Sequence, residues 1–394
     1  MTQVLWNKEI EQISSSGYLN ENITITDALI ENFYNEILKD EEKFLLKLVF
    51  TKNPSQEDLD KLLEKWDIEV KGANKSLMLS YFMKRHPNLK FTNYEGPRLA
   101  GLFNYLRFSN LKVIGHYKKI GKALNQQGII PLIIKGGVMK YLRPEYPRVM
   151  GDIDIVVPEK DFMKSAQIAV SIGYEYKKVE AHSIDIHEKD SEAGTMDIHR
   201  YINMDTGYER KFLDGLFKRA HEEDVFGIKT LVPCFEDLMF ISLVNLARNL
   251  RDKTSQAGLL YTVFDCKFFL EHKQDFDWEI VKENAVKTKT EVQINFAMKF
   301  IEKISPEILP RNIWFEKETN DYSNMVMFNR FYLEDIRTEC RAMKIKDLFK
   351  NPKMLGKYIL LKPKYQLLKG LKKHPRLIEI FIKDLKTKKY DFTK

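Results

Sequence analysis

Apolar side chains recur every three or four residues in two parts of the chain, which enclose a region with a different period. The helical spacing covers residues 25–49 and 98–127 and returns after residue 234. Between residues 129 and 202, short alternating runs such as DIDIVV favour strands, with one helical pattern at 159–174 among them. The pattern predicts an α/β (α+β) fold, in which a small mixed sheet is flanked by N-terminal and C-terminal helical regions.

Changes of period also predict the organisation of the chain. Ser55 is a candidate N-cap before an acidic first turn, and Gly128 ends the long helical pattern before the first strand. The predicted regions are an N-terminal helical region at 1–97, a core at 98–205, a helical subdomain at 206–300 that completes a cleft, and a helical, basic tail at 301–394.

Composition restricts the class of protein. The chain has 394 residues, of which 44% are hydrophobic, so it can bury a large core and is not generally disordered. Its three widely spaced cysteines predict neither a disulfide framework nor a structural zinc site, and they favour a reducing compartment. The first residues lack a signal-peptide pattern, and no run has the length of a membrane span. We therefore expect a cytoplasmic protein.

The positive charge is concentrated at the end of the chain. Residues 341–394 hold 17 Lys and Arg against four Asp and Glu, so the net charge of +8 leaves residues 1–340 acidic. Apolar residues accompany these cations, which favours contact with an anionic membrane surface over a nucleic-acid backbone. The alternative is a terminal helical pair with its lysines in water. If the tail does bind lipid, the protein lies at the inner face of the membrane.

Two aspartates interrupt an apolar strand in the stretch RVMGDIDIVVP. Asp152 and Asp154 share one face of this strand, about 6.6 Å apart, because side chains alternate along a strand. They could be structural, one capping a turn and the other paired with a lysine. A buried carboxylate needs a cation in either case. The pair therefore predicts a cation at this strand, either a lysine or a metal ion.

Two further features suggest what that cation does. Gly136-Gly137 lies between a strand and a short helix, where backbone N–H groups can approach a phosphate, although tight turns use the same pair. Asp197 is a third carboxylate in an apolar strand. Two neighbouring aspartates and a third on an adjacent strand can hold two Mg²⁺ ions for phosphoryl chemistry. These features together favour a phosphate-handling enzyme.

The order of these motifs resembles the nucleotidyltransferase core of the DNA polymerase beta superfamily. IIPLIIKGGVMKYL, YPRVMGDIDIVV, SIGYE and MDIHRYI are more narrowly similar to an uncharacterised bacterial nucleotidyltransferase family with a lysine-glycine motif, D-x-D and a later D-[LI]-H. The resemblance covers about residues 98–300 and implies Mg²⁺, with two ions, or Mn²⁺. It implies metal ligands at Asp152, Asp154 and Asp197, and triphosphate contacts at Lys135, Gly136, Gly137 and Arg148.

The chain departs from the superfamily pattern in two places. Gly137 stands where a serine is common, so Lys135 would have to compensate for the missing hydroxyl. Asn245 and Arg248 stand in a helical stretch where the family often has histidines, whereas Asp265 fits a later family aspartate. These departures leave metal binding plausible and leave the acceptor undefined.

The histidines near these motifs have two interpretations. His199 shares a strand face with Asp197, where it could contact the substrate or take a proton from the acceptor, or it could be structural. Asp185 and His187 belong to a second D-I-H, and with EKDSEAG between the copies the two stretches look like arms of a hairpin. We interpret that earlier arm as solvated.

The predicted activity is Mg²⁺-dependent transfer of an NMP group from an NTP to a hydroxyl or phosphate acceptor, which could be a small molecule, a glycan, a protein or RNA. Three alternatives remain: a kinase-like phosphotransferase using the same metal site, a tRNA-modifying toxin-type nucleotidyltransferase, and a non-catalytic nucleotide-binding protein. Three strand carboxylates argue against the last, because a site without turnover has no need of them.

Overall fold

The structure, a computed structural model, describes residues 27–309 apart from 52, 65–72, 92–94, 147, 180–181, 190–194, 203–208, 253–255 and 307. The chain divides into two units, residues 1–336 and 337–394, and every described residue belongs to the first. The basic segment 341–394, with the membrane contact predicted for it, lies outside the described residues. The region boundaries predicted from the sequence stay predictions.

The N-terminal helices follow the predicted periodicity. They are α2 (Asp27–Ile37), α3 (Asp40–Phe50), α4 (Gln56–Leu63), α6 (Ala73–Arg85) and α7 (Glu95–Gln126). The pattern at 25–49 forms two helices, because Lys39 has an extended backbone and starts a second helix with an acidic first turn. Ser55 is the N-cap of α4, as predicted, and its hydroxyl accepts the N–H of Asp58 at 3.1 Å.

A mixed sheet of seven strands forms the centre of the described part of the chain, in the order β3-β4-β5-β2-β1-β7-β6. Two pairs are parallel, β2 with β5 and β1 with β7, and the other neighbours are antiparallel. The strands are β1 (Leu132–Ile134), β2 (Asp152–Val156), β3 (Tyr174–Val179), β4 (Ser183–Glu188), β5 (Thr195–His199), β6 (His221–Val225) and β7 (Ile228–Val232). The predicted mixed sheet is therefore confirmed.

The sheet extends further than the sequence indicated. Its predicted limit was residue 202, but the β6–β7 hairpin at 221–232 adds two strands beyond β1. Its two-residue turn places Phe226 and Gly227 in the left-handed region, with φ of +56° and +85°, which suits a tight hairpin. The hairpin was missed because β6 begins with the charged run HEED, which has none of the apolar alternation of a strand.

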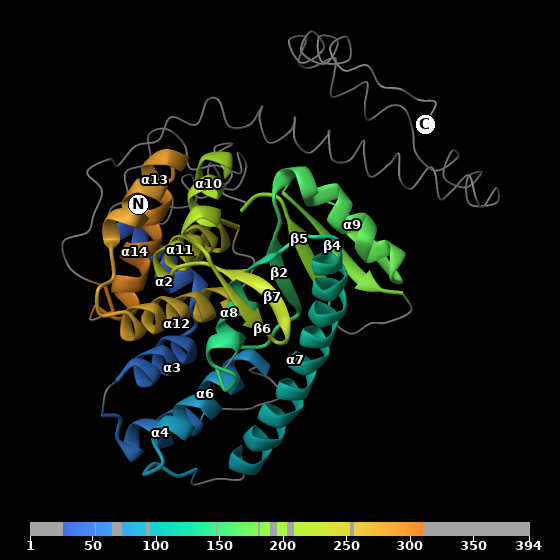
Figure 1. Cartoon of the computed structure of the whole chain (residues 1–394). Helices are drawn as coiled ribbons and strands as arrows, with labels where there is room; N and C mark the ends of the chain where they lie inside the picture. The colour runs from blue at the N-terminus through green and yellow to red at the C-terminus, as the bar shows by residue number, and fades with distance from the viewer. Residues whose placement is uncertain are drawn as a thin grey trace, which may run out of the picture. The chain divides into compact units, whose positions relative to one another are not determined.

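One face of the sheet is covered by α7 and by α9 (Phe162–Ser171), which follows the short 3-10 helix η1 (Glu159–Asp161). Both helices contact β5 and each other, and Figure 1 shows α7 running along the sheet. Lys119 of α7 donates to Glu188 of β4 at 2.6 Å, and Tyr117 bonds to Thr230 of β7. Strand alternation puts the fully buried Ile153 on this covered face.

Helices from the second half of the chain pack together beside the sheet (Figure 1). They are α10 (Glu209–Arg219), α11 (Phe235–Asp252), α12 (Gln256–His272), α13 (Trp278–Thr288) and α14 (Glu291–Ile304). At their centre, Arg219 of α10 donates two hydrogen bonds to the buried Asp237 of α11, at 2.6 and 2.9 Å, and Asn284 of α13 donates to the same carboxylate at 2.9 Å. α11 also contacts α8 (Lys135–Leu142), the helix after β1, and α14 contacts α2.

Within the described ranges, none of the helices has both the length and the apolar character needed to cross a membrane.

Candidate functional site

The predicted carboxylates lie on the face of the sheet opposite α7, which we call the carboxylate face. In the parallel pair of β2 and β5, Asp154 is directly opposite Asp197, so the two side chains share this face. Asp152 lies on the same face two residues earlier, at the start of β2. Ile153 alternates to the covered face, which explains why an otherwise apolar strand carries two carboxylates.

Asp154 is buried between two cationic side chains. The Lys135 ammonium lies 2.5 Å from Asp154 Oδ1, and His199 Nε2 lies 2.9 Å from the same oxygen. Burial raises the pKa of Asp154, but Lys135 and His199 outweigh burial and lower this pKa below its ordinary value. Asp154 is therefore a paired carboxylate, with both contacts at Oδ1.

His199 joins the two strands. Its Nε2 also lies 3.1 Å from Asp197 Oδ2, and its Nδ1 lies 3.3 Å from the carbonyl oxygen of Tyr201. Burial lowers the pKa of His199, but the carboxylates of Asp197 and Asp154 outweigh burial and raise it to about 9. At neutral pH His199 is an imidazolium with both ring nitrogens donating, so it cannot take a proton from an acceptor in this arrangement.

His182 is a residue of this site that the sequence reasoning missed. Its ring lies 5.6 Å from the His199 ring, at an interplanar angle of 32°. Burial lowers the pKa of His182 well below its ordinary value, so a neutral ring packs against the charged one. Because His182 precedes β4 and lies outside any strand alternation, the sequence held no signal for its position.

The two remaining carboxylates differ in their surroundings. Burial raises the pKa of Asp197, but His199 outweighs burial and lowers it, whereas the Asp154 carboxylate raises the pKa of the exposed Asp152 to about 6. Asp197 Oδ1 is buried, and among the described residues it has no hydrogen-bond partner. A buried carboxylate oxygen without a partner is an acceptor that a cation would satisfy.

These donor atoms fit a divalent metal ion. Ligand atoms of Asp154, Asp197 and His199 all lie within 4.8 Å of one another. Carboxylate oxygens are the ligands preferred by Mg²⁺ and Mn²⁺, and the free Asp197 Oδ1 adds a further one. This group contains His199 where the sequence resemblance implied Asp152, which lies at the exposed end of β2.

The Gly-Gly turn has a packing role. A Cβ on Gly137 would come within 2.7 Å of the Ile133 side chain, and one on Gly136 within 2.9 Å of Arg148 Nε. Both glycines therefore allow α8 to pack closely on its neighbours. The residue with positive φ is Lys135, at +53°, which begins α8. This conformation is uncommon outside glycine, and it accompanies the contact with Asp154.

Arg148, predicted to contact a triphosphate, is held in a buried network. Its guanidinium pairs with Asp265 of α12 and lies 5.4 Å from the centre of the Tyr261 ring. The hydroxyl of Tyr146 donates to Asp265 Oδ1 at 3.0 Å, and that of Tyr261 accepts the N–H of Val149 at 3.3 Å. The network fixes the segment before β2 to α12. Asp265, which fits a later aspartate of the family pattern, therefore belongs to this network.

Asn110 of α7 fixes the same segment from the other side. Its side-chain amide donates to the carbonyl oxygen of Arg148 at 2.7 Å and accepts the N–H of Met150 at 2.8 Å. An asparagine on the buried side of a long amphipathic helix was the available signal, since a buried amide needs partners. The start of β2 is thus held by both α7 and α12.

The two D-I-H copies do form hairpin strands, as predicted. β4 and β5 are antiparallel, with Asp185 opposite Asp197 and His187 opposite Thr195. Both Asp185 and His187 are partly buried on the carboxylate face rather than fully solvated. A row of carboxylates thus crosses β4, β5 and β2 at one level. Asp185 is therefore placed beside the site, at the end away from Lys135.

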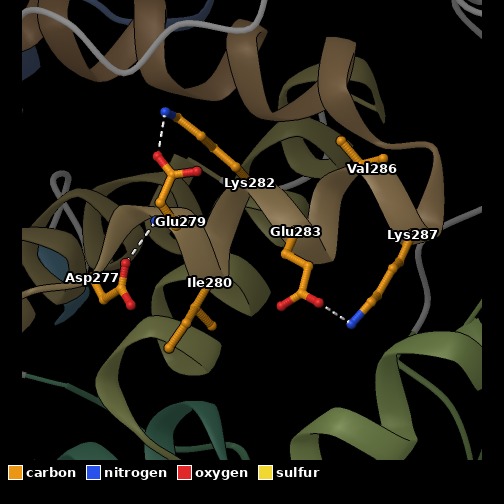
Figure 2. Close-up of a pocket in the computed structure, with 7 residues that line it drawn as sticks. All are labelled: Asp277, Glu279, Ile280, Lys282, Glu283, Val286 and Lys287. Atoms are coloured by element: carbon orange, nitrogen blue, oxygen red, sulfur yellow. Dashed lines mark hydrogen bonds and ion pairs between the residues drawn. The ribbon is translucent and has the colours of Figure 1, made fainter.

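A separate pocket of about 780 Å³ lies along α13 (Figure 2). Its charged side chains pair along the helix, with Lys282 2.7 Å from Glu279 and Lys287 2.5 Å from Glu283. Such surface pairs at i,i+3 and i,i+4 are common on helices and add little binding energy. The pocket contains none of the carboxylates of β2 and β5, and we assign no ligand to it.

Comparison with known proteins gives a family and a remote structural likeness. The sequence model of a family described as uncharacterised nucleotidyltransferases matches residues 85–305, more than half of the chain. No curated protein matches the chain. Among solved structures, the antibiotic-resistance factor ANT(2'')-Ia matches 46% of this chain and 93% of its own, with 11% identity and a TM-score of 0.33.

Proposed function

Because the chain belongs to the family of uncharacterised nucleotidyltransferases, we propose that it transfers an NMP group from an NTP to a hydroxyl or phosphate acceptor with the help of Mg²⁺ or Mn²⁺. The observation that carries the proposal is the β2–β5 register, which sets Asp154 opposite Asp197 with the His199 nitrogen between their carboxylates. The same register supports the resemblance to the DNA polymerase beta superfamily.

The residues have separate roles in this proposal. Asp154 and Asp197, with Asp152, would hold the metal, which supplies positive charge to the phosphates and acidity to the attacking group. Lys135 and the first turn of α8, with Gly136 and Gly137, would face the triphosphate. Arg148 would contact the triphosphate only while it stays paired with Asp265.

Covalent change in the transfer is confined to the α-phosphorus. The acceptor oxygen forms a bond to the α-phosphorus, the bond from that atom to the oxygen bridging the β-phosphate breaks, and pyrophosphate leaves. For a hydroxyl acceptor the proton passes to the oxygen of the Asp197 carboxylate that the metal would not hold. His199 keeps Asp154 and Asp197 aligned rather than accepting this proton.

The test is acceptor mass spectrometry. The purified full chain is incubated with Mg²⁺, each of the four NTPs and pools of small molecules, glycans, RNA or protein. We expect one pool to gain an NMP mass, with pyrophosphate released, and Asp197→Asn to lose this activity by at least about 100-fold. A gain of a phosphoryl group alone would replace the proposal by the phosphotransferase alternative. Products that form equally with Asp197→Asn would remove this carboxylate from the chemistry.

A further inference from the structure

One oxygen of the candidate metal site has two nitrogen neighbours. Asp154 Oδ1 lies 2.5 Å from Lys135 Nζ and 2.9 Å from His199 Nε2. A divalent ion bound to this oxygen would lie within a few ångströms of the Lys135 ammonium. Like charges at such range repel by several times the thermal energy, even where water partly screens them. The ion and the Lys135 ammonium therefore cannot both contact Asp154 in their present positions.

Lys135 is the neighbour that can move. Its side chain is 21% exposed and ends a flexible four-carbon stem, whereas the His199 side chain is 3% exposed. His199 is also held from behind, by the carbonyl oxygen of Tyr201 and by the ring of His182. An incoming ion meets least resistance if the ammonium leaves and the imidazole stays.

The backbone of Lys135 agrees with this role. It is one of three non-glycine residues with positive φ among those described, and it begins α8 directly after the buried strand β1. The other two are in the β6–β7 turn and at the C-terminal end of α13, where such geometry is ordinary. At Lys135 the positive φ accompanies an ammonium directed at the buried Asp154 carboxylate. The residues that follow Lys135 supply the first backbone N–H groups of α8.

We propose that Lys135 is an exchangeable cation, which neutralises Asp154 in the free protein and leaves it when a divalent ion binds. The inference rests on the proposed function, because the released ammonium then turns to the triphosphate at the start of α8. Metal and nucleotide consequently assist each other. The ion binds weakly alone because it must displace Lys135, and the nucleotide removes that cost by accepting the ammonium.

Binding of Mn²⁺ alone tests the exchange. Mn²⁺ affinity is measured by electron paramagnetic resonance on the full chain and on Lys135→Met, Lys135→Gln and Lys135→Arg. We expect the two neutral variants to bind Mn²⁺ alone about tenfold more tightly than wild type, and Lys135→Arg to bind as wild type does. With a non-hydrolysable ATP analogue present, the neutral variants should lose this advantage. Lys160→Met, which removes an exposed lysine of η1, is the matched control and should change neither affinity.

Lysine labelling gives a second measurement that needs no variant. A paired ammonium reacts slowly with acylating reagents, so saturating Mn²⁺ should raise the labelling of Lys135 severalfold, and the ATP analogue should lower it again. Lys140, buried five residues later in α8 with its ammonium donating to the Pro144 carbonyl at 3.2 Å, is the internal reference. Its labelling should stay constant.

The outcomes separate this inference from the proposed function. Equal Mn²⁺ affinity in wild type and the neutral variants, or unchanged Lys135 labelling at saturating Mn²⁺, would overturn the exchange and leave the transferase proposal standing. If neither wild type nor any variant binds Mn²⁺, with or without the ATP analogue, the proposed metal site itself is wrong. Circular dichroism of each variant confirms that the comparison is made between folded proteins.

Discussion

Asp152 and Asp154 are two residues apart on one face of β2, yet their neutralisation should affect stability in opposite ways. Asp154→Asn leaves Lys135 and His199 without their shared carboxylate, which should cost about 2–4 kcal/mol of the free energy of unfolding. Asp152→Asn removes an exposed charge whose pKa the Asp154 carboxylate raises, so stability should stay within about 0.5 kcal/mol of wild type or increase. Urea unfolding in metal-free buffer measures both.

One result would contradict this prediction. If Asp152→Asn were the more destabilising of the two in metal-free buffer, Asp152 would be structural and the metal would need another set of ligands. Lys160→Met, outside the carboxylate face, serves as the reference for loss of a single charge at the surface.

At the residue scale, the sequence predicted positions better than partners. Strand alternation alone placed Asp152 and Asp154 on one face, whereas the family resemblance implied that Asp197 lies beside them as a third ligand. The sequence left a lysine as one possible partner of the two aspartates, but it did not single out Lys135, because the direction of a long side chain depends on the left-handed backbone at its Cα. For the same reason Arg148 looked like a phosphate ligand, although folding brings Asp265 to it from more than 100 residues away.

At the scale of elements, the Arg148–Asp265 pair links the start of β2 to α12. Either Arg148→Met or Asp265→Leu leaves one buried charge unpaired and should cost about 3–5 kcal/mol. The double variant replaces both charges by apolar groups and should cost clearly less than the sum. A double-mutant cycle by urea unfolding measures this coupling.

Additive costs in that cycle would show that the two side chains act independently. Arg143→Met is a suitable control, because its side chain is 46% exposed and pairs with the exposed Glu145. We expect that variant to stay within about 1 kcal/mol of wild type.

Elements with a clear period could be predicted, and those whose pattern is masked by charge could not. α7 and the N-cap at Ser55 follow directly from spacing and capping rules. β6 was not predicted, because its three acidic residues in a row remove the alternation of apolar and polar residues. Only its pairing with β7 makes it a strand. The repeated D-I-H was informative, since antiparallel register sets Asp185 opposite Asp197.

At the scale of the whole molecule, the stability of the helical group should depend on pH through Glu236 in the first turn of α11. Burial raises the pKa of Glu236, but the Lys273 ammonium and the Asp277 N–H outweigh burial and lower it below its ordinary value of 4.5. The unfolded chain therefore binds this proton more readily than the folded one. The contribution of Glu236 is complete above about pH 5 and is lost as the pH falls through the folded-state pKa.

Urea unfolding of wild type and Glu236→Gln between pH 7 and pH 3 measures that contribution. The difference in unfolding free energy should be largest near neutral pH and should shrink as the solution becomes acidic. Glu279→Gln is the control, because the Glu279 side chain is 76% exposed and its loss should leave the curve almost unchanged. Parallel curves for wild type and Glu236→Gln would show that the Lys273 contact does not hold in solution.

The order of the strands has a further consequence for the carboxylates. β2 and β5 each have a neighbour on both sides, and the edges of the sheet are formed by β3 and β6. Backbone amides of interior strands exchange with deuterated solvent chiefly when a large part of the structure opens, whereas edge strands fray at much smaller cost. We therefore expect Asp154 and Asp197 to belong to the slowest-exchanging part of the sheet, and their alignment should persist when the edge strands open locally.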